Sequence, residues 1–90
     1  MSNPLLEVLA ERKKQDEKWG IQNHMPEIWM LILGEEVGEA QRAVLEAICP
    51  NGNKLDGEWL KEYRKELIQV AAVAIAAIES LDRNTKCPIK

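Results

Sequence analysis

The sequence has few of the residues that form most zinc and nucleophilic sites. It contains one histidine, His24, and two isolated cysteines, Cys49 and Cys87, each followed by proline. Zinc sites usually group cysteine and histidine at short spacings, so this pattern argues against zinc. We interpret the two cysteines as reduced thiols of a cytoplasmic protein.

The sequence also lacks phenylalanine, a long hydrophobic run and an excess of positive charge. The longest apolar run, Val70–Ile78, is too short to span a bilayer, and the N-terminus has no signal-peptide core. The formal net charge is −3, with basic residues spread along the chain, which argues against a nucleic-acid-binding face. Because 46% of the residues are hydrophobic and 30% are charged, we expect a globular cytoplasmic protein without a membrane or nucleic-acid partner.

The hydrophobic periodicity predicts an all-α fold, and no alternating pattern typical of strands is present. Asn3-Pro4 suits a helix start, Trp19-Gly20 a helix end and Pro26 the start of a second helix. We predict a single helical domain, residues 1–90, with helices at about 4–19, 26–48 and 57–83 and a tail at 84–90. Three helices cannot cover an apolar segment such as Val70–Ile78 on all sides, which predicts oligomerisation into a larger bundle.

Three glutamates lie in or beside the apolar face of the second helix. Glu36 falls near the middle of that face, Glu39 at its edge and Glu35 next to them. The apolar members of the face are Ile32, Leu33, Ala40, Ala43, Val44 and Ala47. An unpaired buried carboxylate costs several kcal/mol or takes up a proton. The segment therefore requires a cation, a basic partner or water.

Two glycines, Gly34 and Gly38, also interrupt the second helix. Each costs about 1 kcal/mol relative to alanine in a helix interior. Their spacing of four places both on one face beside the carboxylates. The close approach of a neighbouring helix or a ligand would explain them.

The third helix repeats the polar spacing of the second. Glu66 and Gln69 follow Trp59 by seven and ten residues, as the first acidic pair follows Trp29. The two polar pairs can therefore face each other between the helices. We expect the apolar stripe of the third helix, which contains Glu66, to run from Trp59 to Leu81. Oxygen ligands without histidine favour Mg²⁺ or Mn²⁺. This pattern indicates metal-assisted hydrolysis of a phosphate compound, and a solvated acidic face is the alternative.

These residues resemble the signature of the MazG-like all-α nucleoside triphosphate pyrophosphohydrolases. The signature is Glu36-x-x-Glu39, a gap of twenty-six residues, and Glu66-x-x-Gln69. The similarity extends from about Glu11 to Arg83 and includes Glu11-Arg12, Gln15, Lys18-Trp19-Gly20, His24, Trp29, Ile32-Leu33, Glu35-Glu36-Val37-Gly38-Glu39-Ala40 and Glu66-Leu67-Ile68-Gln69-Val70-Ala71-Ala72-Val73.

The resemblance implies a homodimeric or homotetrameric bundle that binds Mg²⁺, with Mn²⁺ as the other candidate. It implies cleavage of a nucleoside triphosphate between the α and β phosphates, giving the monophosphate and pyrophosphate, in nucleotide-pool house-cleaning. By position, Glu36, Glu39 and Glu66 match metal-binding carboxylates, with Gln69 as the fourth ligand. Glu35 and Glu36 are the candidate catalytic residues. Glu35 would bind a second metal through water or orient the attacking water.

Gln69 departs from the family pattern, in which the second motif usually ends in aspartate. An amide oxygen can ligate Mg²⁺ but contributes no charge, so weaker metal binding, one fewer metal and lost catalysis all stay open. One alternative function is a nucleotide-binding or regulatory module that kept the fold. Another is a plain helical assembly protein whose acids pair with Lys or Arg of a neighbouring chain.

The candidate substrate-binding residues are Lys18, Trp19, His24 and Trp29. Tryptophan rings can stack on a base, although Trp29 and Trp59 also fit a packed core because both lie on apolar stripes. His24 either touches the ligand or caps the second helix. Other basic residues either meet phosphates or form a solvated surface: Lys14, Lys54, Arg64 and Lys65.

Overall fold

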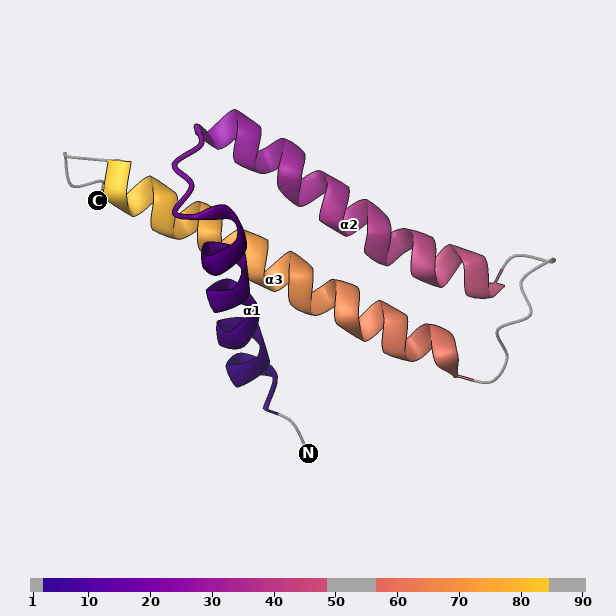
Figure 1. Cartoon of the computed structure of the whole chain (residues 1–90). Coiled ribbons are helices and arrows are strands. Elements are labelled where there is room, and N and C mark those ends of the chain that lie inside the picture. The colour runs from indigo at the N-terminus through magenta and orange to yellow at the C-terminus, as the bar shows by residue number, and fades with distance from the viewer. Residues whose placement is uncertain (1–2, 49–56, 85–90) are drawn as a thin grey trace.

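The computed structural model describes residues 3–48 and 57–84, which form three helices (Figure 1). These are α1 (Pro4–Trp19), α2 (Pro26–Ile48) and α3 (Glu58–Asn84). Their bounds agree with the predicted ones to within one residue, and the described segments contain no strand, which confirms the all-α expectation. The features expected at Cys49, Lys54, Cys87 and the tail from residue 85 lie outside the described residues.

Local signals account for both ends of α1. The Asn3 side chain accepts a hydrogen bond from the Leu5 N–H at 2.9 Å, and Pro4 occupies the first helical position. At the other end Gly20 has φ 73°, and its N–H donates to the Asp16 carbonyl at 2.8 Å. Residues other than glycine rarely adopt this backbone conformation, so the helix ends at the glycine, where the sequence predicts.

Helix α3 is the centre of the fold. It lies beside α2, and α1 lies across it, whereas α1 and α2 do not pack on each other within the described chain (Figure 1). The core cluster is Trp29, Val73 and Ala76, with Ile32, Leu33 and Ala77 packed against it. Within the described chain α3 is the only helix that contacts both others, so it is covered on more than one side.

The most buried residues of α3 are Ala72, Val73, Ala76 and Ser80; Val73 belongs to the expected stripe, and the other three lie outside it. Leu81, placed at the end of that stripe, is 45% exposed. Helix α1 packs on α3 in addition to α2, and the most buried positions of α3 are occupied by small residues.

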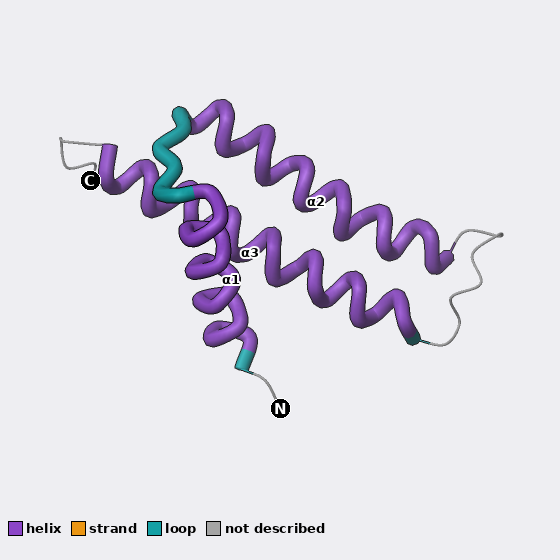
Figure 2. Tube along the Cα trace, in the orientation of Figure 1, coloured by secondary structure: helices purple, strands orange, loops and turns teal. Residues whose placement is uncertain are grey.

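The connector between α1 and α2, the loop drawn between these helices in Figure 2, is hydrogen-bonded to the C-terminal part of α3. The Arg83 side chain donates to the Asn23 Oδ1 at 2.9 Å and to the Gln22 carbonyl at 3.0 Å. The buried Ser80 hydroxyl donates to the His24 carbonyl at 3.3 Å. These bonds fix the chain between the two helices on α3.

The protein is elongated and exposes much apolar surface. Its extents are 51 × 29 × 27 Å, and its radius of gyration is 15.6 Å, compared with about 12 Å expected for a compact domain of this length. Large hydrophobic side chains are exposed on all three helices, among them Leu5, Leu6, Leu9, Met30, Leu31, Leu45, Leu60 and Ile78. Among the described residues, no helix combines the length and the apolar character needed to cross a membrane.

Candidate metal and nucleotide site

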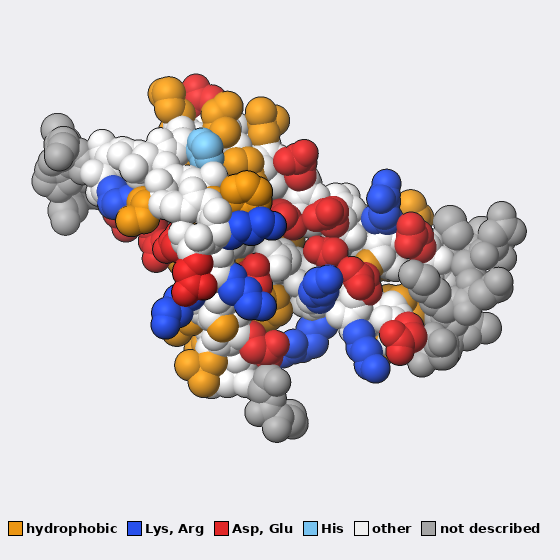
Figure 3. Space-filling model, in the orientation of Figure 1, with side chains coloured by type: hydrophobic (Ala, Val, Ile, Leu, Met, Phe, Trp, Pro, Cys, Tyr) orange, Lys and Arg blue, Asp and Glu red, His pale blue; other side chains and the backbone are white. Residues whose placement is uncertain are grey.

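Three of the predicted metal ligands come together between α2 and α3. Glu36 and Glu39 are one turn apart on α2, and Glu66 faces them from α3. One carboxylate oxygen of each residue lies within 4.8 Å of the other two. Acidic side chains also gather over the middle of these helices in the space-filling view (Figure 3). The predicted facing of the two polar pairs therefore holds for these three residues.

Of the three carboxylates of this acidic triad, Glu36 lies in the environment least favourable to its negative charge. Its Oε2 is buried and has no hydrogen-bond partner. The pKa of Glu36 is raised from 4.5 to about 7, chiefly by burial, with further contributions from the hydrogen bond to Glu39 and the charges of Glu39, Glu66 and Glu35. Burial, followed by the neighbouring carboxylates Glu39 and Glu62, also raises the pKa of Glu66. A cation held among these oxygens would remove this cost.

The donor set fits a hard divalent cation. All three side chains of the triad offer carboxylate oxygen, the ligand type that Mg²⁺ prefers, and none offers nitrogen or sulfur. Mg²⁺ is usually held by one or a few carboxylates and keeps positions for water or phosphate oxygen. The unpartnered Oε2 of Glu36 is an acceptor available for such an ion.

A cleft of about 820 Å³ opens beside the triad. Helices α1, α2 and α3 all contribute to its walls, and Glu36 links it to the triad. The polar and aromatic lining residues are Glu7, Glu11, Lys14, Gln15, Lys18, Trp19 and Gln22, then Trp29 and Glu36, then Arg64, Lys65 and Gln69. The cleft thus brings acidic, basic and aromatic side chains to one place.

The structure places four of the other predicted site residues in this cleft: Lys18, Trp19, Trp29 and Gln69. Trp19 is 61% exposed, and the Lys18 Nζ lies 4.7 Å from the centroid of its ring. Trp29 is 6% exposed and belongs to the core cluster, so the packing alternative is correct for it, although it also lines the cleft. Its Nε1 has no hydrogen-bond partner.

Two further candidates lie elsewhere. Glu35 is exposed and lines a separate recess with Glu36 and Glu39. His24 lines an apolar groove beside Met25, and its ring packs edge-on against Trp29 with the ring centroids 5.0 Å apart.

Of the two alternatives for His24, a ligand contact and a cap of α2, neither is tested by the contacts of the described residues. The Met25 carbonyl accepts the first hydrogen bonds of this helix, from the Ile28 and Trp29 N–H groups at 3.0 and 3.1 Å. His24 supplies a carbonyl to Ser80 and a ring to Trp29.

The expected close neighbour of Gly34 and Gly38 is absent from the described part of this chain. A Cβ added at either glycine would meet no atom within 4 Å. A helix of the same chain therefore does not explain them, and a second copy or a ligand stays a prediction.

The sequence did not indicate two interhelical ion pairs. Arg12, 9% exposed, bonds to Glu79 of α3, and Arg64 forms a two-pronged pair with Glu7 at 2.7 and 2.6 Å. Arg64, one of the residues weighed as a phosphate ligand, is therefore occupied by Glu7. Charges three or four residues apart along α1 were visible, but partners 57 and 67 residues away were not.

No protein-family model, curated protein or solved structure matches this chain. The resemblance to the MazG-like pyrophosphohydrolases therefore depends on the sequence motifs alone.

Proposed function

We propose that this protein is an Mg²⁺-dependent nucleoside triphosphate pyrophosphohydrolase, which converts a triphosphate to the monophosphate and pyrophosphate. The observation that carries this proposal is the acidic triad, whose member Glu36 has an unpartnered oxygen and lines a large cleft. A volume of about 820 Å³ lies in the range of small-molecule sites. The family resemblance supports this reaction, and the triad and the cleft support the proposed location of the active site.

Each residue has a defined role in this proposal. Glu36, Glu39 and Glu66 would hold the metal, and the Gln69 amide would add a neutral oxygen ligand. Bound Mg²⁺ neutralises phosphate charge and lowers the pKa of a coordinated water. Glu35, which shares a recess with Glu36 and Glu39, would orient the attacking water or accept its proton.

Helix α1 would bind the rest of the nucleotide. The Lys18 ammonium suits a phosphate oxygen, and the exposed ring of Trp19 offers a stacking face for a base. Both residues line the cleft from α1, and Glu36 lines the same cleft from α2.

The test is a pyrophosphate-release assay over the canonical and several damaged nucleoside triphosphates, with Mg²⁺ or Mn²⁺. We expect turnover by the wild type and its loss in Glu36→Gln, because the amide cannot supply the charged ligand. Glu17→Gln removes an exposed carboxylate of α1 outside the cleft and should keep the wild-type rate. A wild-type rate equal to that of Glu36→Gln would reject the proposal.

A second candidate function is a nucleotide-binding module without hydrolysis. Gln69 favours it, since this residue lines the cleft where the family usually has an acid. Calorimetry would then show nucleotide binding with no pyrophosphate release. Turnover that appears only in Gln69→Asp would show that the missing charge limits the chemistry, whereas clear wild-type turnover would exclude a binding-only role.

We infer that the working form is a homodimer, or a tetramer built from it. Two apolar grooves lie between α2 and α3, one of them lined by Val37, Val44, Leu45, Tyr63 and Leu67 and the other by residues that include Met30 and Ile78. A second copy covering them would bury the apolar side chains that leave the protomer so extended.

Sedimentation measurements test this state. Leu67→Glu places a charge in the first groove and should shift the protein toward monomer, and Lys61→Glu, an exposed change on the same helix, should not. A wild type that sediments as a monomer at micromolar concentration would contradict the inference.

A further inference from the structure

Helix α1 forms one wall of the cleft but is held by few apolar contacts. Its only buried residues are Val8 and Arg12, and it packs on α3 alone among the described helices. Three leucines near its start, Leu5, Leu6 and Leu9, are exposed. Hydrophobic burial therefore contributes little to the position of this helix.

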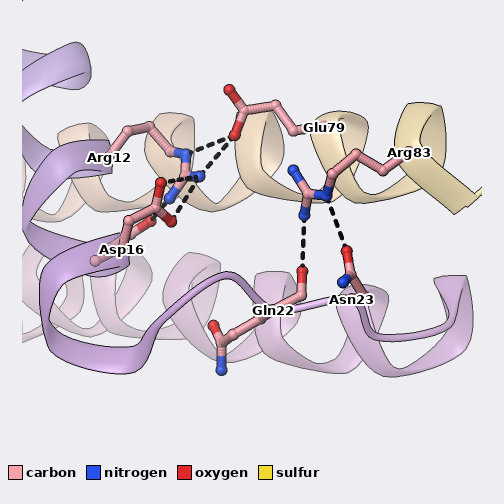
Figure 4. Close-up of polar contacts among 7 residues, drawn as sticks. Arg12, Asp16, Gln22, Asn23, Glu79 and Arg83 are labelled. Atoms are coloured by element: carbon pink, nitrogen blue, oxygen red, sulfur yellow. Dashed lines mark hydrogen bonds and ion pairs between the residues drawn. The ribbon is translucent and has the colours of Figure 1, made fainter.

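Arg12 makes the first of two polar attachments to α3 (Figure 4). Its Nε and Nη2 donate to the Glu79 Oε1 at 3.2 and 2.6 Å. Nη2 also donates to both carboxylate oxygens of Asp16, at 3.0 and 3.2 Å, and Nη1 donates to the Gln15 Oε1 at 3.1 Å. The guanidinium thus joins two carboxylates on different helices while it is almost fully buried.

Arg64 makes the second attachment. Its Nη1 and Nη2 donate to the two carboxylate oxygens of Glu7 at 2.7 and 2.6 Å. Such parallel bonds fix orientation as well as distance, because the planar guanidinium matches the carboxylate. The two attachments lie five residues apart on α1 and fifteen apart on α3, between Arg64 and Glu79, so together they set how α1 crosses α3.

The chain after α1 provides a fixed point. The connector is bonded to α3 through Arg83 and Ser80, as Figure 4 shows for Arg83. Between this anchored connector and α1 lies Gly20, with φ 73°. Gly20 therefore lies between the connector bonded to α3 and the helix held by the two polar attachments.

We propose that Arg12 and Arg64 are positioning residues that hold α1 as a wall of the nucleotide cleft. Through α1 they place Lys14, Lys18 and Trp19 opposite Glu36 and Gln69. This inference rests on the proposed function of the same cleft. Neither arginine contacts the reacting phosphate in this account, so their loss weakens substrate binding and leaves the chemical step intact.

The first test is hydrogen exchange of the full-length protein carrying a charge swap. Glu7→Arg and Arg64→Glu each put like charges together, and the double variant restores an opposite pair. We expect amide exchange in α1 to accelerate about tenfold in each single variant, as for the loss of one charge-assisted pair. Exchange in α2 and α3 should stay near the wild-type rate, and the double variant should return α1 to it.

The matched control is Lys13→Glu, which makes the same charge change at an exposed position of α1 outside the cleft. It should leave α1 exchange unchanged. Equal acceleration in all three helices, no acceleration in the single variants, or no recovery in the double variant would each overturn the inference. Arg12→Gln should behave like the single variants, but the conclusion does not depend on whether that buried change folds.

The second test separates binding from chemistry. In the single variants the KM for the nucleoside triphosphate should rise about tenfold while kcat stays within about twofold, and the double variant should recover the wild-type KM. A lower kcat with an unchanged KM would refute the positioning role. If the wild type has no turnover at all, the proposed function fails, and the exchange experiment still decides whether the two ion pairs hold α1.

Discussion

Glu36→Gln should stabilise the metal-free protein, and the gain should grow with pH. In the folded protein the pKa of Glu36 is raised from 4.5 to about 7, chiefly by burial. The folded state therefore binds this proton more tightly than the unfolded state. The stability that the protonated group provides is fully present below pH 4.5 and is lost as the pH rises to about 7. Glutamine keeps the neutral shape at every pH.

The size of the effect follows from the same two pKa values. At about 1.36 kcal/mol per pH unit, the ionised side chain costs at most about 3.4 kcal/mol above pH 7. Because Glu36 is only partly buried, solvent screening reduces this to about 1–2 kcal/mol. For a domain of this size, that corresponds to about 4–16 °C in melting temperature.

Thermal and urea denaturation in EDTA at pH 5 and pH 8, at one protein concentration, would measure the difference. Glu17→Gln serves as the control for removing an exposed carboxylate of the same charge. We expect the gap between Glu36→Gln and the wild type to widen toward pH 8 and the gap for Glu17→Gln to stay constant. A gap for Glu36→Gln that is the same at both pH values would refute the claim that burying this charge is costly.

Three other predictions concern the metal, the core and α2. Mg²⁺ should raise the melting temperature of the wild type and have less effect on Glu66→Gln, because an ion stabilises only the state that binds it; equal shifts in calorimetry would contradict the triad. Ala72→Leu should cost about 1–3 kcal/mol in urea unfolding, since this fully buried position between the helices has no room for a larger side chain. Gly34→Ala should raise the free energy of unfolding of the protomer by up to about 1 kcal/mol, because the added Cβ meets no atom within 4 Å. A lower free energy of unfolding would instead indicate a second copy packed closely there.

Much of the fold was predictable because its signals are local. Asn3-Pro4, Gly20 and Pro26 set helix ends through caps and backbone conformation within a few residues. The position of Glu36 near the middle of the α2 face follows from the helical repeat, and the equal spacing on α3 predicted that Glu66 would face it. The acidic triad could therefore be named before its distances were known.

The tertiary structure decided the contacts between helices, which the helical repeat of one segment cannot predict. The crossing of α1 over α3 makes Arg12 a buried link to Glu79 and brings Lys18 and Trp19 into the same cleft as Glu36. These outcomes depend on pairings across 57 to 67 residues, and single-helix periodicity carries no information about them. The sequence by itself determined which residues share a helix face; only the packing of three helices determined which of those faces meet.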